Sequence, residues 1–300
     1  MIMEEKSRLG RGLKDVSRFY LSDSPRDESH EPPKDESHEK PEGEPGGQEP
    51  GRDLPQPRQC RVIRVICPAS ALMGAYFTAN FSLELARHRQ KMIIFDLSSR
   101  EGEGVQDVLG EAAHPDTASG VLRVRLYGLH DIPVHCSEPD GEAELLDRLN
   151  GSGDHNGDRW AVVNTPFCLD SLAKSLVDFD ALLLSTLNEA SLLQCYACAK
   201  VIEQRDPKAG ISLVLIDPAS SEQASEVSSR FCTFMKQRLG VSVGYLGHLL
   251  RDKALEDSLS EHRPLVLGFE PSPARESLAA VSRAFLEQRG LPVFGEEGRP

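Results

Sequence analysis

The sequence predicts an α/β domain built on a mostly parallel, doubly wound sheet with helices on both of its faces. The first observation is that two short apolar runs, Val62–Cys67 and Lys91–Leu97, enclose a segment with helical spacing, Phe77–Arg89. Two strands on either side of one helix form a parallel βαβ unit. The second observation is that further apolar runs, among them 159–164 and 211–217, alternate with helical stretches along the rest of the chain. This alternation is typical of a doubly wound sheet.

Composition excludes several classes of protein. The chain has 300 residues, a net charge of −13 and a pI of about 5.2, which argues against a basic nucleic-acid-binding surface. Its seven cysteines follow no disulfide-rich pattern, and no signal peptide is evident. We therefore expect the protein to reside in a reducing cytoplasm. Residues 65–83 carry no charge, but Pro68, Gly74 and Asn80 dilute this run. We therefore interpret it as protein core rather than a membrane span.

The N-terminal residues 1–21 form a short basic, amphipathic segment. Leu9, Leu13 and Val16 lie on one face of a helix drawn over this stretch, while Arg8 and Arg11 take other positions. We expect this segment to be a docking motif for a protein partner, through an apolar contact and through the two arginines. The alternatives are a helix packed on its own domain and a frayed terminus.

Residues 22–59 separate this motif from the folded part of the chain. They contain eight prolines, eleven acidic residues and five basic ones, and almost no apolar residues. Such a stretch cannot bury a core, so we expect a disordered linker. The folded domain is expected over residues 60–294, followed by a tail at 295–300.

The connection after the first predicted strand reads Cys67-Pro68-Ala69-Ser70-Ala71-Leu72-Met73-Gly74-Ala75. Its frame resembles S-G-K-G-G-V-G-K-[ST], the deviant phosphate loop of the MinD/ParA family of P-loop ATPases. Asn80-Phe81-Ser82 then stands at the family's N-L-A, and Phe95-Asp96-Leu97-Ser98 at its I-D-L-D. The resemblance implies a P-loop NTPase fold in which Ala69 replaces the signature lysine, Gly74 the phosphate lysine and Ala75 the magnesium-ligating hydroxyl.

Two further positions indicate that the nucleotide site is degenerate. In the family, the strand matching 159–164 ends in the Walker B aspartate, and here that position is Asn164, whose amide carries no charge for magnesium. Ser98 replaces the second aspartate of D-L-D, while Asp96 is retained. A phosphate cradle also needs glycines and a lysine, and this loop offers Pro68, which has no N–H. The alternative is an ordinary βαβ turn that never bound phosphate.

The resemblance continues through most of the folded part. The segment from Asp180, DALLLSTLNEASLLQCYACAKVI, is similar to the version found in the flagellar number regulator FlhG and its relatives, and 244–264 is similar to a later family motif. The family's adenine-reading asparagine falls on Ile216 or Asp217. Cys195 and Cys198 form a C-x-x-C inside a helical pattern, which favours packing thiols over a metal site.

These observations predict a non-catalytic MinD/ParA/FlhG-like protein. We expect a cytoplasmic bacterial regulator or scaffold that binds a protein partner, takes part in the spatial positioning of a cell-surface or polar machine, and uses no cofactor. It would contact neither nucleic acid nor the membrane interior. One alternative is a weak ATPase, completed by a partner, that uses ATP and magnesium. Another is a purely structural subunit.

Overall fold

The computed structural model describes residues 60–88, 90–97, 102–115, 122–124, 132–136, 142–151, 159–268 and 271–293. The expected motif at 1–21, with Arg8, Leu9, Arg11, Leu13 and Val16, lies outside the described residues, as do the linker at 22–59, Ser98 and the tail at 295–300.

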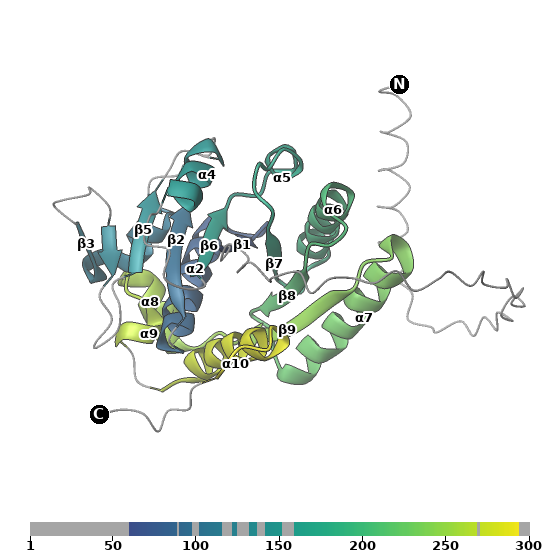
Figure 1. Cartoon of the computed structure of the whole chain (residues 1–300). Coiled ribbons are helices and arrows are strands. Elements are labelled where there is room, and N and C mark those ends of the chain that lie inside the picture. Colours follow the sequence, from purple (N-terminus) through teal and green to yellow (C-terminus); the bar gives the residue numbers. More distant parts are fainter. Residues whose placement is uncertain are drawn as a thin grey trace, which may run out of the picture. The chain divides into compact units, whose positions relative to one another are not determined.

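A nine-stranded sheet forms the centre of the described part, in the order β3-β4-β5-β2-β6-β1-β7-β8-β9. Figure 1 shows it running from β3 on the left to β9 on the right. The seven strands from β5 to β9 in this order are parallel, and β4 pairs antiparallel with both of its neighbours. The strands are β1 (Arg61–Ile66), β2 (Lys91–Asp96), β3 (Ala113–Pro115), β4 (Leu122–Val124), β5 (Ile132–Cys136), β6 (Arg159–Thr165), β7 (Asp180–Ser185), β8 (Ile211–Ile216) and β9 (Val243–Leu249).

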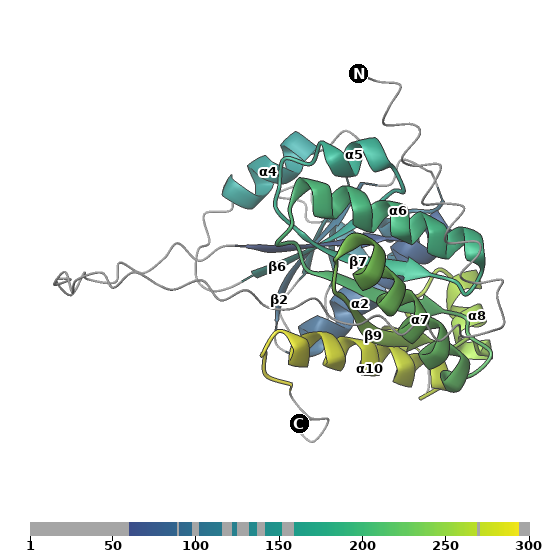
Figure 2. The same ribbon diagram turned by 90° about the vertical axis from the view of Figure 1, so that its right-hand side faces the viewer.

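Helices cover both faces of the sheet, as the alternating pattern predicts. Figure 2 shows α4, α5 and α6 on one side of the strands and α2 and α10 on the other. The helices are α2 (Ala71–Arg87), α3 (Val105–Leu109), the 3₁₀ turn η1 (Gly110–Ala112), α4 (Glu142–Gly151), α5 (Leu169–Ala173), α6 (Glu189–Arg205), α7 (Ser221–Leu239), α8 (Lys253–Ser260), α9 (Leu265–Gly268) and α10 (Pro273–Gln288). The predicted fold class, a mostly parallel doubly wound sheet, is confirmed.

The central helix α2 is an exception to the usual amphipathic pattern. Every residue from 74 to 86 is buried, because the helix lies between the sheet and a second set of helices. The ring of Phe81 stacks on that of Phe77, with 5.3 Å between the ring centres, and forms an edge-to-face contact with Phe285 on α10, with 5.4 Å between the ring centres. Residues 65–67 and 74–83 of the charge-free run are therefore core, as the sequence indicates. In the part of the chain that the structure describes, no helix is long and apolar enough to cross a membrane.

The start of α2 differs from the sequence-based expectation. Helical spacing predicts a helix from Phe77, but α2 begins six residues earlier, at Ala71. The physical reason is local: Ser70 is the N-cap, and its Oγ accepts a hydrogen bond from the Met73 N–H at 3.2 Å. Alanine, leucine and methionine follow it and favour helix, whereas the glycines of a phosphate loop would not.

A buried arginine lies on the opposite face of the central strand β1. The side chain of Arg64 has no exposed surface, and its Nη2 donates to Glu142 at the start of α4 and to Ser175 Oγ at 2.9 Å. Its guanidinium also lies 4.8 Å from the ring centre of Phe179. Burial lowers the pKa of this guanidinium, and the carboxylate of Glu142 opposes that effect. This cluster fastens α4 and the α5–β7 connection to the sheet.

Candidate functional site

Parallel strands bring their carboxyl ends to one edge of the sheet, and the candidate site residues lie there. Asp96, the last residue of β2, pairs in register with Asn164 on β6, and Asn164 pairs with Val65 on β1. The strand order reverses around β1, where doubly wound sheets bind their ligands. The structure therefore brings Asp96, Asn164 and the start of α2 together.

The retained carboxylate of Asp96 is occupied by hydrogen bonds from the protein itself. Its Oδ1 accepts from Asn164 Nδ2 at 2.8 Å, and its Oδ2 accepts from the backbone N–H of Val105 at 2.5 Å. Asp96 and Asn164 are each only 3% exposed. Val105 is the first residue of α3, so the pair ties the start of this helix to the sheet. We call these three residues the Asp96 latch.

The connection between β1 and α2 has a different form from a phosphate cradle. Residues 71–75 belong to the helix, and within its first turn the Met73 N–H donates to Ser70 Oγ and the Gly74 N–H to the Ser70 carbonyl. The backbone N–H groups of Ser70 and Ala69 act to lower the pKa of the Cys67 thiol. Burial is the larger effect on this thiol and raises its pKa.

Gly74 and Ala75 lie inside the first turns of α2, and both are buried. A Cβ built at Gly74 would lie 3.2 Å from both Asn164 Oδ1 and Cys67 Cβ, closer than ordinary van der Waals contact. A long side chain at this position, such as the phosphate lysine, would have to displace one of them. Ala69 lies apart from this group, since it is exposed in the preceding turn.

The ends of β7 and β8 complete the same edge. Ser185 Oγ donates to the Thr186 carbonyl at 2.7 Å and lies 3.0 Å from Ser191 Oγ. Ser191 Oγ in turn accepts a hydrogen bond from the Thr186 N–H at 3.2 Å. Ile216 ends β8 and is buried, whereas Asp217 is exposed with a φ of 59°. Asp217 forms an ion pair with Arg251 at 3.4 Å. Of the two residues left open for the adenine-reading position, only Asp217 can reach a ligand.

The C-x-x-C pair does not form a metal centre with its described surroundings. Cys195 and Cys198 are both completely buried in α6. Burial raises the pKa of the Cys198 thiol to about 12, and it also raises the pKa of Cys195. Protonated thiols are poor metal ligands. Among the described residues, no group of three or more His, Cys, Asp or Glu side chains could hold a metal ion.

Sequence reasoning missed an apolar surface at this edge. The four central strands β6, β1, β7 and β8 are followed by residues 166–170, 67–73, 186–190 and 217–221, which together contain no lysine or arginine. Their carboxylates are Asp170, Glu189 and Asp217. The apolar residues that remain exposed or half-buried there are Pro68, Ala69, Ala71, Leu72, Met73, Pro166, Phe167, Leu169, Leu187, Ala190 and Ala219. We call these four segments the carboxyl-end surface. The signal was available in the sequence as uncharged residues directly after β6, β1 and β7.

Comparison with known proteins places this fold among MinD and ParA structures. The chain is similar to MinD in the MinC:MinD cell division complex of Aquifex aeolicus, with a TM-score of 0.59 and 14% identity over 79% of this chain and 99% of that one. For MinD of Pyrococcus horikoshii, complexed with Mg-ADP, the TM-score is 0.57 and the identity 13%, over 77% of this chain and 98% of that one. For a ParA family ATPase of Chlorobium tepidum, the TM-score is 0.55 and the identity 14%, over 75% of this chain and 98% of that one.

Sequence comparison alone finds no relative: no protein-family model and no curated protein matches the chain. The structural neighbours, all at low identity, are MinD/ParA-family ATPases. The chain therefore has the MinD/ParA P-loop NTPase fold, as the degraded motifs imply.

Proposed function

We propose that this chain is a non-catalytic protein of the MinD/ParA type, which acts as a regulator or scaffold by binding a protein partner. The observation that carries the proposal is the Asp96 latch, in which both oxygens of the one retained carboxylate accept hydrogen bonds from the protein. Magnesium binding needs carboxylate oxygens that are available to the metal or to its water shell. Here such binding would first have to break buried hydrogen bonds.

The chemistry of the phosphate side supports the same proposal. No basic residue occurs from Val65 through Leu83, so nothing in the expected loop neutralises a triphosphate. Ala69, Gly74 and Ala75 stand where the family has its two lysines and its hydroxyl, and Ser98 and Asn164 where it has two aspartates. ATP and magnesium are accordingly not cofactors in this proposal.

The partner-binding part of the proposal rests on the fold and on the N-terminal motif. A domain of this fold is found with a protein partner in the MinC:MinD complex of Aquifex aeolicus. In the present chain, Leu9, Leu13 and Val16 would form the apolar contact, and Arg8 and Arg11 would meet an acidic surface. The finer assignment, to FlhG-like proteins that position a cell-surface or polar machine, rests on the similarity of the segment that begins at Asp180.

Two measurements on the purified full chain test the non-catalytic part. Phosphate release from Mg·ATP should stay at the background rate, and light scattering should give one mass with and without Mg·ATP. The reason for the second expectation is that Ala69 replaces the lysine that reaches across to the second subunit in family dimers. Steady hydrolysis, or a dimer that forms only with ATP, would contradict the proposal and favour an ATPase.

The regulatory part is tested with partner candidates rather than with nucleotide. The full chain and a chain without residues 1–21 should be compared for binding to proteins encoded beside it. Binding that is lost on truncation supports the proposed role of the motif. Equal binding by both chains would assign partner recognition to the folded domain instead.

A further inference from the structure

We propose that Ser221 and His248 form a nucleophile and a general base that together hydrolyse neutral, short-chain carboxylic esters. Ser221 is the last residue of the carboxyl-end surface and the first residue of α7, and His248 lies near the end of the edge strand β9. Two strands, β7 and β8, separate β9 from β1 and the degenerate nucleotide site. The inference therefore goes beyond the proposed function, whose non-catalytic character concerns ATP.

The side chains of Ser221 and His248 lie within hydrogen-bond distance of each other. His248 Nε2 is 3.2 Å from Ser221 Oγ, and His248 Nδ1 is 3.2 Å from the hydroxyl of Tyr245. In the tautomer that carries its proton on Nδ1, the imidazole donates to Tyr245 and its Nε2 accepts from Ser221. A serine hydroxyl beside a base that a third group orients is the arrangement that activates this weak nucleophile.

The surroundings of His248 keep the base in the protonation state that the reaction needs. Partial burial lowers the pKa of His248 from its ordinary value of 6.5, so the imidazole is neutral at pH 7. Burial also raises the pKa of Tyr245, so its hydroxyl stays uncharged at the same pH. Ser221 is exposed, which leaves its hydroxyl accessible to a substrate and to water.

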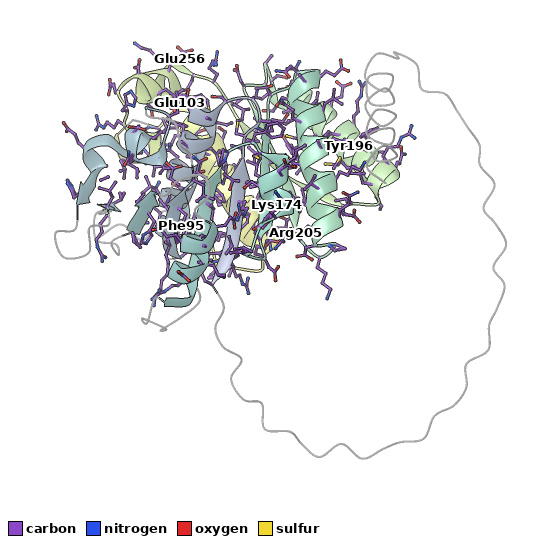
Figure 3. All side chains as sticks on the ribbon, turned by 90° about the horizontal axis from the view of Figure 1, so that it is seen from above. Phe95, Glu103, Lys174, Tyr196, Arg205 and Glu256 are labelled. Atoms are coloured by element: carbon purple, nitrogen blue, oxygen red, sulfur yellow. The ribbon has the colours of Figure 1, made fainter. Side chains whose placement is uncertain are left out.

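The packing of α7 and β9 fixes the positions of the two residues. Figure 1 shows α7 alongside β9, and the two elements are in contact. The N-cap of α7 is Ser220, whose Oγ accepts from the Gln223 N–H at 3.2 Å, so the helix begins at Ser221. Helix α7 is also held against α6, where the ring of Tyr196, labelled in Figure 3, packs with 5.6 Å between ring centres on Phe234.

A pocket beside the pair has room for a short acyl chain. Its volume is about 270 Å³, and His248 forms part of its wall. Leu250, Pro273 and Ala280 contribute apolar surface, which suits a hydrocarbon chain. The carboxylate of Glu276 lies on the same wall and disfavours an acyl group that is itself anionic. These features select neutral esters of short fatty acids.

The proposed reaction is a two-step transfer of the acyl group to water. Ser221 Oγ forms a bond to the ester carbonyl carbon while its proton passes to His248 Nε2, and the backbone N–H of Ser221, which has no partner within its helix, donates to the oxyanion. The bond to the alcohol oxygen then breaks, and the alcohol leaves with that proton. Water attacks the acyl-serine in the same way, which releases the carboxylic acid and restores Ser221.

Hydrolysis of p-nitrophenyl butyrate by the purified full chain, without nucleotide, tests the pair. Wild type should release p-nitrophenolate faster than buffer does. Ser221→Ala and His248→Gln should each lower this rate at least about tenfold, because a positioned general base has effects of this size or larger. Ser229→Ala is the matched control, since Ser229 is an exposed serine about two turns further along α7, and it should hydrolyse the ester as wild type does.

A covalent probe identifies the nucleophile independently of turnover. A fluorophosphonate should label wild type and Ser229→Ala but not Ser221→Ala, and mass spectrometry of peptides should place the label on Ser221. The pocket is tested with Ala280→Phe, which fills the space that a longer chain needs. This variant should slow hydrolysis of the butyrate ester at least about tenfold more than that of p-nitrophenyl acetate.

The inference would be overturned by equal rates in wild type and Ser221→Ala, by a label on another residue, or by no release above the buffer rate. Equal slowing of both esters in Ala280→Phe would contradict the assignment of the pocket. These results leave the proposed function untouched, because it is tested with Mg·ATP. Hydrolysis of ATP would in turn contradict the proposed function and leave the assignment of Ser221 and His248 standing.

Discussion

At the scale of single residues, the candidate site is defined by what Asp96 contacts. A carboxylate with one oxygen on Asn164 Nδ2 and the other on the Val105 N–H is a structural hydrogen-bond acceptor rather than a metal ligand. Asn164 matters here for the two donors of its amide, because an aspartate in its place could donate nothing while ionised. Asn164 thus satisfies one oxygen of the buried Asp96 carboxylate.

The first prediction concerns Asn164→Asp, which restores the family's aspartate. Placing a second carboxylate against buried Asp96 should lower the free energy of unfolding at pH 7 by about 2–3 kcal/mol, through lost hydrogen bonding and charge repulsion. The folded pair would hold a proton more tightly than the unfolded chain does, so the deficit should be full at pH 7 and should shrink toward pH 5. Urea unfolding of wild type and Asn164→Asp at pH 7 and pH 5 measures this loss in the free energy of unfolding. Asn164→Ala, which removes the same donor but adds no charge, should show a deficit that changes less between the two pH values.

The second prediction concerns the buried ion pair of Arg64 and Glu142. Glu142→Ala leaves a buried guanidinium without its carboxylate and should lower the free energy of unfolding by about 3–5 kcal/mol. Replacing both partners with apolar residues, in Arg64→Met combined with Glu142→Leu, leaves no lone buried charge and should be far milder, within about 1 kcal/mol of wild type.

The matched control for this pair is Glu226→Ala. Glu226 pairs with Arg230 at 2.7 Å on the surface of α7, where both side chains are more than half exposed. Its loss should change stability by less than about 1 kcal/mol in the same urea titrations. A Glu142→Ala variant as stable as Glu226→Ala would show that the buried pair does not fasten α4 to the sheet.

At the scale of elements, the early start of α2 at Ala71 decides what the connection between β1 and α2 can bind. Strand positions could be predicted because buried parallel strands are short, continuous apolar runs, and β1, β2, β6 and β8 lie within one residue of their predicted ends. The start of α2 could not be predicted from the same signal. The apolar periodicity of a fully buried helix is weak, and the residues before Phe77 were aligned with a loop of the family. The capping role of Ser70 was the missed signal.

The third prediction belongs to this helix. Ser70→Ala removes the side chain that accepts the Met73 N–H, and it should lower the free energy of unfolding by about 1 kcal/mol. Ser70→Asp keeps a capping oxygen and places a negative charge at the helix N-terminus, so it should be as stable as wild type. Chemical denaturation of the three proteins compares them directly. If Ser70→Ala were no less stable than Ser70→Asp, the hydroxyl would not be what begins the helix at Ala71.

At the scale of the whole molecule, the chain has the fold of MinD and ParA ATPases, and we propose that this fold here carries a surface that does not suit a nucleotide. Alternating strands and helices predict a parallel sheet, but the strand order comes from long-range pairing that a local pattern does not contain. The antiparallel edge strands β3 and β4 could not be predicted in the same way, because strands of three residues have little pattern of their own. The hydrogen bond between Asp96 and Asn164 likewise depends on β2 and β6 being neighbours, 68 residues apart in sequence.

The central claim is that this fold no longer binds ATP, and calorimetric titration of the full chain with Mg·ATP tests it most directly. The expected result is no saturable heat up to millimolar nucleotide, for wild type and also for Gly74→Lys. A lysine alone restores neither the glycines of the loop nor an available carboxylate, and its Cβ would crowd Asn164 and Cys67. A micromolar dissociation constant for Mg·ATP with the wild-type chain would contradict this account.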